Sequence, residues 1–65
     1  MTNLSTIVLE RRLQLGLSQR QVAKKSGCCP RTVRAIEKNE RGIGFDYVVS
    51  ILKALGLRLK VEEMK

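Results

Sequence analysis

The chain contains no histidine and no tryptophan, and its aromatic residues are one phenylalanine and one tyrosine. Without histidine, and with only six acidic residues scattered along 65 positions, it offers no arrangement of side chains for acid–base, nucleophilic or metal-assisted catalysis. Two cysteines without a histidine are too few to complete a zinc site. The sequence therefore predicts that the chain is not an enzyme and binds no metal or cofactor.

Long apolar runs are also missing. No stretch is long enough to cross a membrane, and residues 1–15 lack the basic and then apolar pattern of a secretory leader. These absences predict a cytoplasmic protein with no membrane partner. A chain of 65 residues forms one small domain. Such a domain buries only about 60 percent of its unfolded surface, so we expect dimerisation to add stability.

Basic residues outnumber acidic ones by 13 to 6, and the excess is concentrated in one segment. Segment 11–41 contains two acidic residues, Glu37 and Glu40, and nine basic residues, namely Arg11, Arg12, Arg20, Lys24, Lys25, Arg31, Arg34, Lys38 and Arg41. Its net charge of +7 equals that of the whole chain. This segregation is typical of a protein that binds a polyanion. The alternative, a solvated cationic face that serves only solubility, stays open on charge alone.

The same segment carries a telling spacing of small and apolar residues. Two short helices can cross closely only where a small side chain lies at the crossing, and Ala23 supplies one. The link between them generally requires a positive φ, which glycine adopts at little steric cost, and Gly27 is placed for it. Val33 and Ile36 then share one face of the helix that follows this link. This spacing predicts a helix-turn-helix, a motif that reads DNA.

Local signals mark where the helices begin and end. Ser18 and Gln21 form a capping box, which predicts a helix from Gln19 to about Lys25. Pro30 suits the first turn of a helix that runs to about Lys38, because its missing N–H needs no partner there. A first helix is expected to begin after Asn3 or Ser5 and to end near Gln14, with Leu4, Val8 and Leu15 at helical spacing. Residues 39–44 are expected to form a loop. A last helix is expected from Phe45 to Leu55, with these side chains buried: Phe45, Val48, Val49, Leu52 and Leu55.

After Gly56 the pattern changes to a strict alternation of apolar and charged residues over 57–62. Such alternation predicts a half-buried β-strand. The chain has no second strand candidate, so we expect the partner strand to come from another copy, with Leu57, Leu59 and Val61 on the helices beneath. The alternative is a frayed or helical tail. The predicted organisation is a helix-turn-helix domain over 1–56, a dimerisation strand over 57–62 and a tail over 63–65.

The sequence contains two runs that carry a family resemblance, Leu15-Gly16-Leu17-Ser18-Gln19 through Ile36-Glu37 and Leu52-Lys53-Ala54-Leu55-Gly56-Leu57. In these runs it resembles the Cro and phage-repressor helix-turn-helix family over nearly the whole chain. The alternating ending is most similar to that of HipB-like antitoxins. The resemblance implies an all-α fold with one C-terminal strand: a four-helix, lambda-repressor-like domain whose strand forms an intermolecular two-stranded β-ribbon in a homodimer.

The same resemblance implies function and partners. It implies a nucleoid-associated repressor that binds double-stranded DNA at a palindromic operator. The HipB-like branch adds a toxin partner, a HipA-type kinase, and autoregulation of the operon that encodes both. A stand-alone repressor without a toxin is the alternative. A helix-turn-helix used only to bind protein is a third possibility, against which the charge segregation argues.

The resemblance also implies which residues meet DNA. Gln19, at the start of the second helix, corresponds to a phosphate contact. The exposed face of the third helix enters the major groove, and here it comprises Pro30, Arg31, Arg34, Ala35 and Lys38, with Thr32 as a further candidate.

These DNA-facing residues have different expected roles. Arg31 and Arg34 are the strongest base readers, because a guanidinium fork matches O6 and N7 of guanine. Lys38, Asn39 and Arg41 are expected on phosphates. Pro30 stands where many relatives carry a base-contacting glutamine, and we expect it to touch a thymine methyl instead.

Two residue pairs receive structural interpretations. Arg12 and Glu37 match the positions of a family ion pair that ties the first helix to the third. Cys28 and Cys29 invite a redox interpretation, but a disulfide between neighbours strains the peptide and cytosolic thiols stay reduced. We expect Cys28 to fill a small apolar site after the turn and Cys29 to replace a capping serine.

Overall fold

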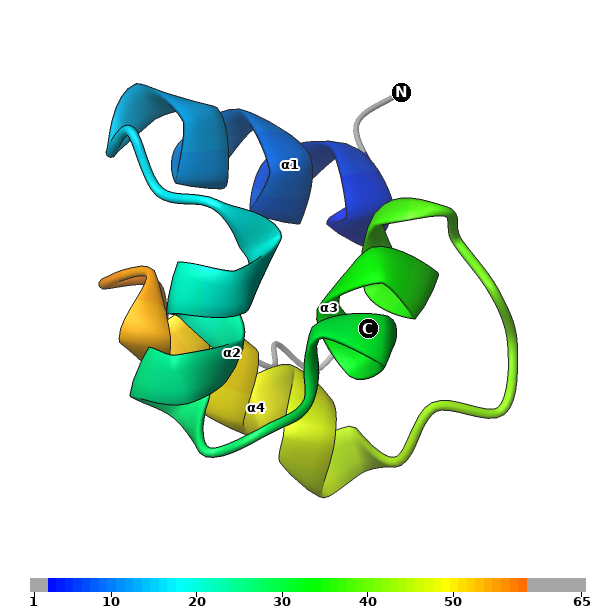
Figure 1. The fold of residues 1–65 in the computed structure, drawn as a ribbon. Coiled ribbons are helices and arrows are strands. Elements are labelled where there is room, and N and C mark those ends of the chain that lie inside the picture. The colour runs from blue at the N-terminus through cyan, green and yellow to red at the C-terminus, as the bar shows by residue number, and fades with distance from the viewer. Residues whose placement is uncertain (1–2, 59–65) are drawn as a thin grey trace.

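A computed structural model describes residues 3–58 of the chain, and over this range the chain folds into four short helices. In chain order they are α1 (Leu4–Gln14), α2 (Gln19–Ser26), α3 (Pro30–Glu37) and α4 (Phe45–Ala54). Figure 1 shows α1 across the top, with α2 and α4 below it and α3 toward the viewer. α2 packs against both α3 and α4, and α1 packs against α3. No helix among the described residues is long and apolar enough to span a membrane.

Side chains that accept hydrogen bonds from backbone N–H groups fix the starts of α1 and α2. Asn3 Oδ1 accepts from the N–H of Thr6 at 3.0 Å. Ser18 Oγ accepts from the N–H of Gln21 at 3.0 Å, and Gln21 Oε1 accepts from the N–H of Ser18 at 2.7 Å, which completes the capping box. The predicted starts of the last three helices are confirmed, and the predicted ends are correct to within one residue.

The turn between α2 and α3 depends on Gly27, whose φ is +77°. The N–H groups of Gly27 and Cys28 both donate to the carbonyl of Ala23, which closes the end of α2. A Cβ added at Gly27 would meet no atom within 4 Å, so the left-handed backbone alone favours glycine there. Ala23 itself is buried, and the predicted helix-turn-helix is confirmed.

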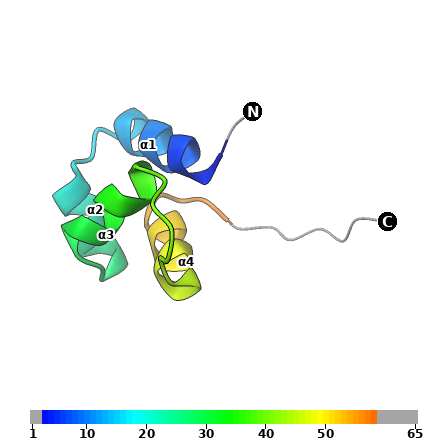
Figure 2. The ribbon, with the colours of Figure 1, turned by 90° about the vertical axis from the view of Figure 1, so that its right-hand side faces the viewer.

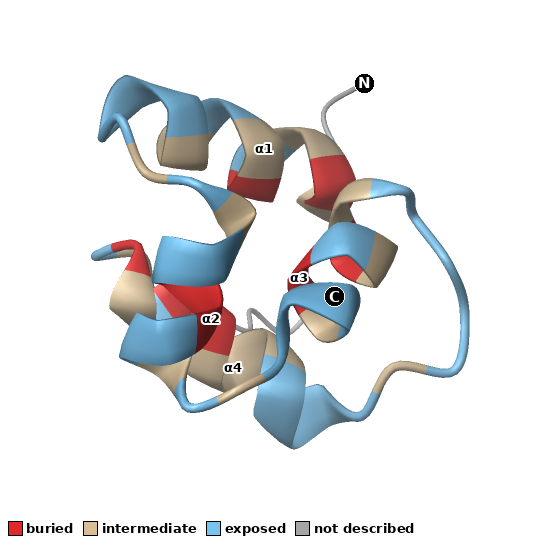
Figure 3. Cartoon of the chain, in the orientation of Figure 1, coloured by how far each residue is buried: buried red, intermediate tan, exposed pale blue. Residues whose placement is uncertain are grey.

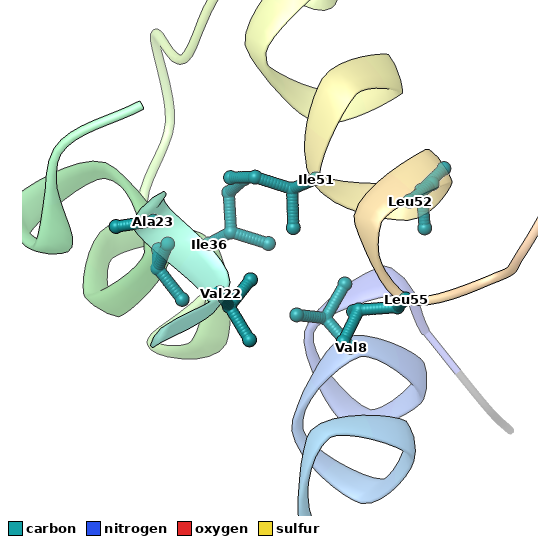
Figure 4. Packing of buried hydrophobic residues seen from close by; sticks show 8 residues of the cluster. Val8, Val22, Ala23, Ile36, Ile51, Leu52 and Leu55 are labelled. Atoms are coloured by element: carbon teal, nitrogen blue, oxygen red, sulfur yellow. The ribbon is translucent and has the colours of Figure 1, made fainter. Parts of the chain in front are cut away.

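The core lies between the four helices and is entirely aliphatic. Its buried side chains are Val8, Val22, Ala23, Val33, Ile36, Ile51, Leu52 and Leu55. Figure 4 shows members from α1, α2, α3 and α4 facing one another, and Figure 3 shows the buried positions turned inward. Burial of each large aliphatic side chain contributes roughly 1.5 to 3 kcal/mol relative to its exposure to water.

The predicted core contained two errors on α4. Phe45 is 65% exposed, whereas Ile51, absent from the predicted set, is fully buried. Phe45 begins α4 at the end of the helix farthest from α1, so no core lies beneath it (Figure 1). Val48 and Val49 are half-buried, while Leu52 and Leu55 are buried as predicted. Leu15 lies beyond the last residue of α1 and is exposed.

The predicted dimerisation strand is only partly within the described residues. The structure contains no strand over 3–58, and Leu59 and Val61 lie outside that range. Leu57 serves its own chain: its N–H donates to the carbonyl of Leu52 at 2.8 Å, and its side chain packs against the core. The N–H of Leu57 therefore closes α4, and its side chain lies on the helices as expected.

A buried network of charged and polar side chains joins three of the helices. Arg12 Nε donates to Glu37 Oε2 at 2.6 Å, and Arg12 Nη2 donates to Glu37 Oε1 at 3.1 Å. The same guanidinium donates to the carbonyl of Leu17 at 2.9 Å, and Gln19 Nε2 donates to Glu37 Oε1 at 3.0 Å. Only 13% of the Arg12 side chain and 5% of the Glu37 side chain are exposed. The expected ion pair thus forms and fixes α1, the start of α2 and the end of α3.

We expect Arg12→Ala to lower the free energy of unfolding by about 3 to 5 kcal/mol, because it leaves the Glu37 carboxylate buried without a cation. Urea melts measure the loss. Lys53→Ala removes an exposed base of α4 and is the control, with an expected change within about 0.5 kcal/mol. Equal melts for Arg12→Ala and the wild type would contradict a structural role for the ion pair.

The different burial of Ile51 and Phe45 predicts that their substitutions lower the free energy of unfolding by different amounts. Ile51→Ala removes a fully buried side chain and should cost about 2 to 5 kcal/mol. Phe45→Ala removes a larger but mostly exposed side chain and should cost less than about 1 kcal/mol. Thermal or urea unfolding of the two variants side by side tests the order. If Phe45→Ala were the more damaging change, the register of α4 would be wrong.

Candidate nucleic-acid interface

α3 has one buried and one exposed face. Val33 and Ile36 pack into the core, three residues apart. Arg31, Arg34 and Lys38 recur at spacings of three and four on the exposed face. The sequence-predicted base readers therefore lie together, and none of them has a hydrogen bond or ion pair to another side chain among the described residues.

The smaller residues of α3 complete this surface. Pro30 is exposed at the first helical position, which it occupies as predicted. Thr32 and Ala35 are half-buried. Both line a hollow beside Arg31.

A hollow of about 290 Å³ lies beside the exposed face of α3. One wall is formed by Arg31, Thr32 and Ala35, and the other by Glu40, residues 42–44 and Tyr47. Tyr47 is 53% exposed although it is an aromatic residue at the start of α4. Sequence reasoning missed this second wall. The signal that could have found it is the position of the two aromatic residues of the chain, Phe45 and Tyr47, which lie two residues apart and are both exposed in the first turn of α4.

The nine basic residues of segment 11–41 divide into two groups. Arg12 is held by Glu37, and Arg11 Nε donates to the carbonyl of Leu55 at 2.9 Å, so both serve the fold. The other members are all exposed: Arg20, Lys24 and Lys25 on α2, Arg31, Arg34 and Lys38 at α3, and Arg41 in the following loop. Figure 2 shows α2 and α3 together on one side of the molecule, while residues 57 and 58 lead away from them. The exposed positive charge of the segment is therefore carried by the motif itself.

Two of the expected phosphate ligands are placed differently from the base readers. Gln19 already donates one Nε2 hydrogen to Glu37, so its remaining side-chain donor is the second hydrogen of that amide. Asn39 adopts a left-handed backbone, with φ of +60°, at the end of α3. It lines a second hollow, of about 170 Å³, with Leu4 and Ser5, and residues 40, 42 and 43 line both this hollow and the one beside α3. Asn39 and Arg31 border different hollows.

The two cysteines have different surroundings. Cys28 is half-buried and packs against the core, as expected. Cys29 occupies the N-cap position of α3 as expected, but its thiol does not make the capping hydrogen bond to the backbone that a serine there would make. Its Sγ instead lies 3.2 Å from Thr32 Oγ1. This hydrogen bond is the main cause of a lowered pKa for the Cys29 thiol, and backbone N–H groups at the start of α3 add to it.

Among residues 3–58, no group of three or more histidine, cysteine, aspartate or glutamate side chains is placed to hold a metal ion. The polar side chains at the surface of α2, α3 and the loop after α3 include guanidinium, ammonium, hydroxyl and amide donors. Such donors bind phosphate oxygens and the edges of bases.

Comparison with known proteins agrees with this geometry. A family model described as helix-turn-helix matches residues 8–61, which is most of the chain and includes all four helices in whole or in part. No curated protein matches the sequence.

Proposed function

The chain belongs to this helix-turn-helix family of DNA-binding transcriptional regulators, and we propose that it is a repressor that binds a palindromic operator as a homodimer. The observation that carries the proposal is the position of the exposed charge. Every exposed basic residue of segment 11–41 lies on α2, on α3 or in the loop after α3. These are the elements that meet DNA in such motifs.

In the proposed complex, α3 lies in the major groove with its first turns toward the bases. Arg31 and Arg34 read guanine through O6 and N7, and each such bidentate contact discriminates by about 1 to 3 kcal/mol. Pro30, Thr32 and Ala35 offer apolar contacts to thymine methyl groups.

Lys38, Arg41 and Gln19 contact phosphates in this proposal. Gln19 is the first residue of α2, Lys38 directly follows α3, and Arg41 lies in the loop after it. Phosphate contacts at these positions fix the register of the helix without reading sequence. Asn39, which follows Lys38, has a left-handed backbone that ends the helical path before the loop that carries Arg41.

Substitutions of Arg31 and Lys38 separate base reading from phosphate binding. After selection of preferred sites from random duplexes, we expect Arg31→Ala to lower discrimination by about 1 to 3 kcal/mol at one base pair. Lys38→Ala should weaken all duplexes alike and reduce the slope of log affinity against log salt by about 1. Fluorescence anisotropy over a salt series measures both effects.

Lys53→Ala is the matched control, because it removes an exposed positive charge from α4 and leaves the proposed interface intact. Equal affinity of the wild type for selected and random duplexes would contradict sequence-specific repression. Equal effects of Lys53→Ala and Lys38→Ala would contradict the placement of the interface on α3.

The homodimer is supported by the alternating pattern over 57–62. We expect residues 57–61 of two copies to pair, with Leu57, Leu59 and Val61 on the helices beneath, and Leu57 packs against the core of its own chain. Leu59→Lys should convert a dimer to a monomer at micromolar concentration in light scattering. Lys60→Ala, on the other face of the alternation, should leave the dimer intact. A dimer that survives Leu59→Lys would contradict pairing through this segment.

A narrower function as a HipB-like antitoxin is supported by the same alternating ending. Its partner would be a toxin of the HipA kinase type, and the protein would repress the operon that encodes both. The alternative is a stand-alone repressor. Native co-purification followed by intact-mass measurement distinguishes the two, because only the antitoxin carries a stoichiometric larger protein.

A further inference from the structure

The side chains of Cys29 and Thr32 are joined across the first turn of α3. Cys29 Sγ lies 3.2 Å from Thr32 Oγ1, and either atom can donate. Cys29 is the N-cap residue, and Thr32 is the third residue of the helix. The backbone of the same turn is satisfied separately, because the N–H of Thr32 donates to the carbonyl of Cys29 at 3.0 Å. Among the described residues, the side-chain partner of the sulfur is the Thr32 hydroxyl, and the sulfur makes no capping hydrogen bond to the backbone.

This pair lies on the surface assigned to DNA. Thr32 lines the hollow beside α3 together with Arg31 and Ala35. Cys29 is exposed at the start of the same helix. The first turn of a recognition helix is the part that reaches base edges in helix-turn-helix proteins. A change in what Thr32 presents is thus a change at the place where sequence is read.

Threonine can present two different groups to DNA. Its hydroxyl can donate to or accept from a base, and its methyl can pack against the methyl of thymine. In a helix, threonine divides between two χ1 rotamers, so a threonine without a partner can turn either group outward. The bond to Cys29 holds the oxygen toward the start of α3. The methyl is then the group left to contact another molecule.

We propose that Cys29 is a specificity-determining residue that acts through Thr32: it holds the Thr32 hydroxyl, so that Thr32 presents its methyl group and favours thymine at the base pair it faces. The inference rests on the proposed function, because it requires α3 in the major groove. Cys29 is a positioning residue in this account and need not touch a base.

The lowered pKa of the Cys29 thiol gives a test of the pair without DNA. The Thr32 hydroxyl is the largest cause of that shift. Thr32→Val removes the hydroxyl at nearly constant shape, so the pKa of Cys29 should rise and alkylation by iodoacetamide should require higher pH. A Cys28→Ala background leaves Cys29 as the one thiol in both proteins. An unchanged pH profile of alkylation would overturn the proposal.

The effect on specificity is tested by selection from random duplexes with four proteins: the wild type, Cys29→Ala, Thr32→Val and the double variant. Cys29→Ala frees the hydroxyl and should reduce the preference for thymine at one base pair by about threefold to tenfold, the range of one hydrogen bond. Thr32→Val should keep that preference within about twofold. The double variant should behave like Thr32→Val, because valine restores the methyl without needing the sulfur.

Two results of the selection would also overturn this inference alone. If Thr32→Val lost the thymine preference as fully as Cys29→Ala, the hydroxyl itself would read the base. If Cys29→Ala weakened all duplexes equally, Cys29 would act only by supporting α3, and a lowered melting temperature would accompany that result. A wild type without any preference among duplexes would overturn the proposed function together with this inference.

Discussion

The carboxylate of Glu37 is the interaction on which the arrangement of the helices depends. It stands at the end of α3 and accepts hydrogen bonds from Arg12 of α1 and from Gln19 at the start of α2. Apolar burial is non-directional, so the aliphatic core holds the helices together without fixing their angles. The directional bonds to Glu37 supply that angle. Because the carboxylate is almost wholly buried, its negative charge is tolerated only with the cation and the amide in place.

This network also decides which positive charges remain for a partner. Arg12 neutralises Glu37, and Arg11 binds the carbonyl of Leu55 at the end of α4. The remaining bases of segment 11–41 are exposed on or near α2 and α3, with Glu40 the one exposed acid of that segment. Their mutual repulsion opposes folding of a small domain, and a bound polyanion relieves it. Stability and DNA affinity are thus linked through the same charges, so low salt should favour the complex over the free chain.

Much of the fold was predictable because its signals are local. A capping box at Ser18, a proline at position 30 and a glycine at position 27 each act within one turn of backbone, and each predicted a boundary that the structure has. The exposed face of α3 followed from helical spacing in the same way. The Arg12–Glu37 pair spans 25 residues, and only the family resemblance pointed to it. The prediction of which α4 side chains are buried was partly wrong, because a helical pattern indicates a face but does not say how far the neighbouring helices extend along it.

The choice of partner at Cys29 could not be read from the sequence for a different reason. An N-cap side chain has two acceptable partners in reach, the backbone N–H of Thr32 and the hydroxyl of Thr32, and both lie three residues on. A serine oxygen accepts strongly and favours the N–H. A thiol sulfur is larger and a weak acceptor, whereas a hydroxyl can rotate to meet it. In this chain the sulfur at the capping position pairs with the Thr32 hydroxyl, so the residue that starts the helix is tied to a side chain that lines the hollow beside α3.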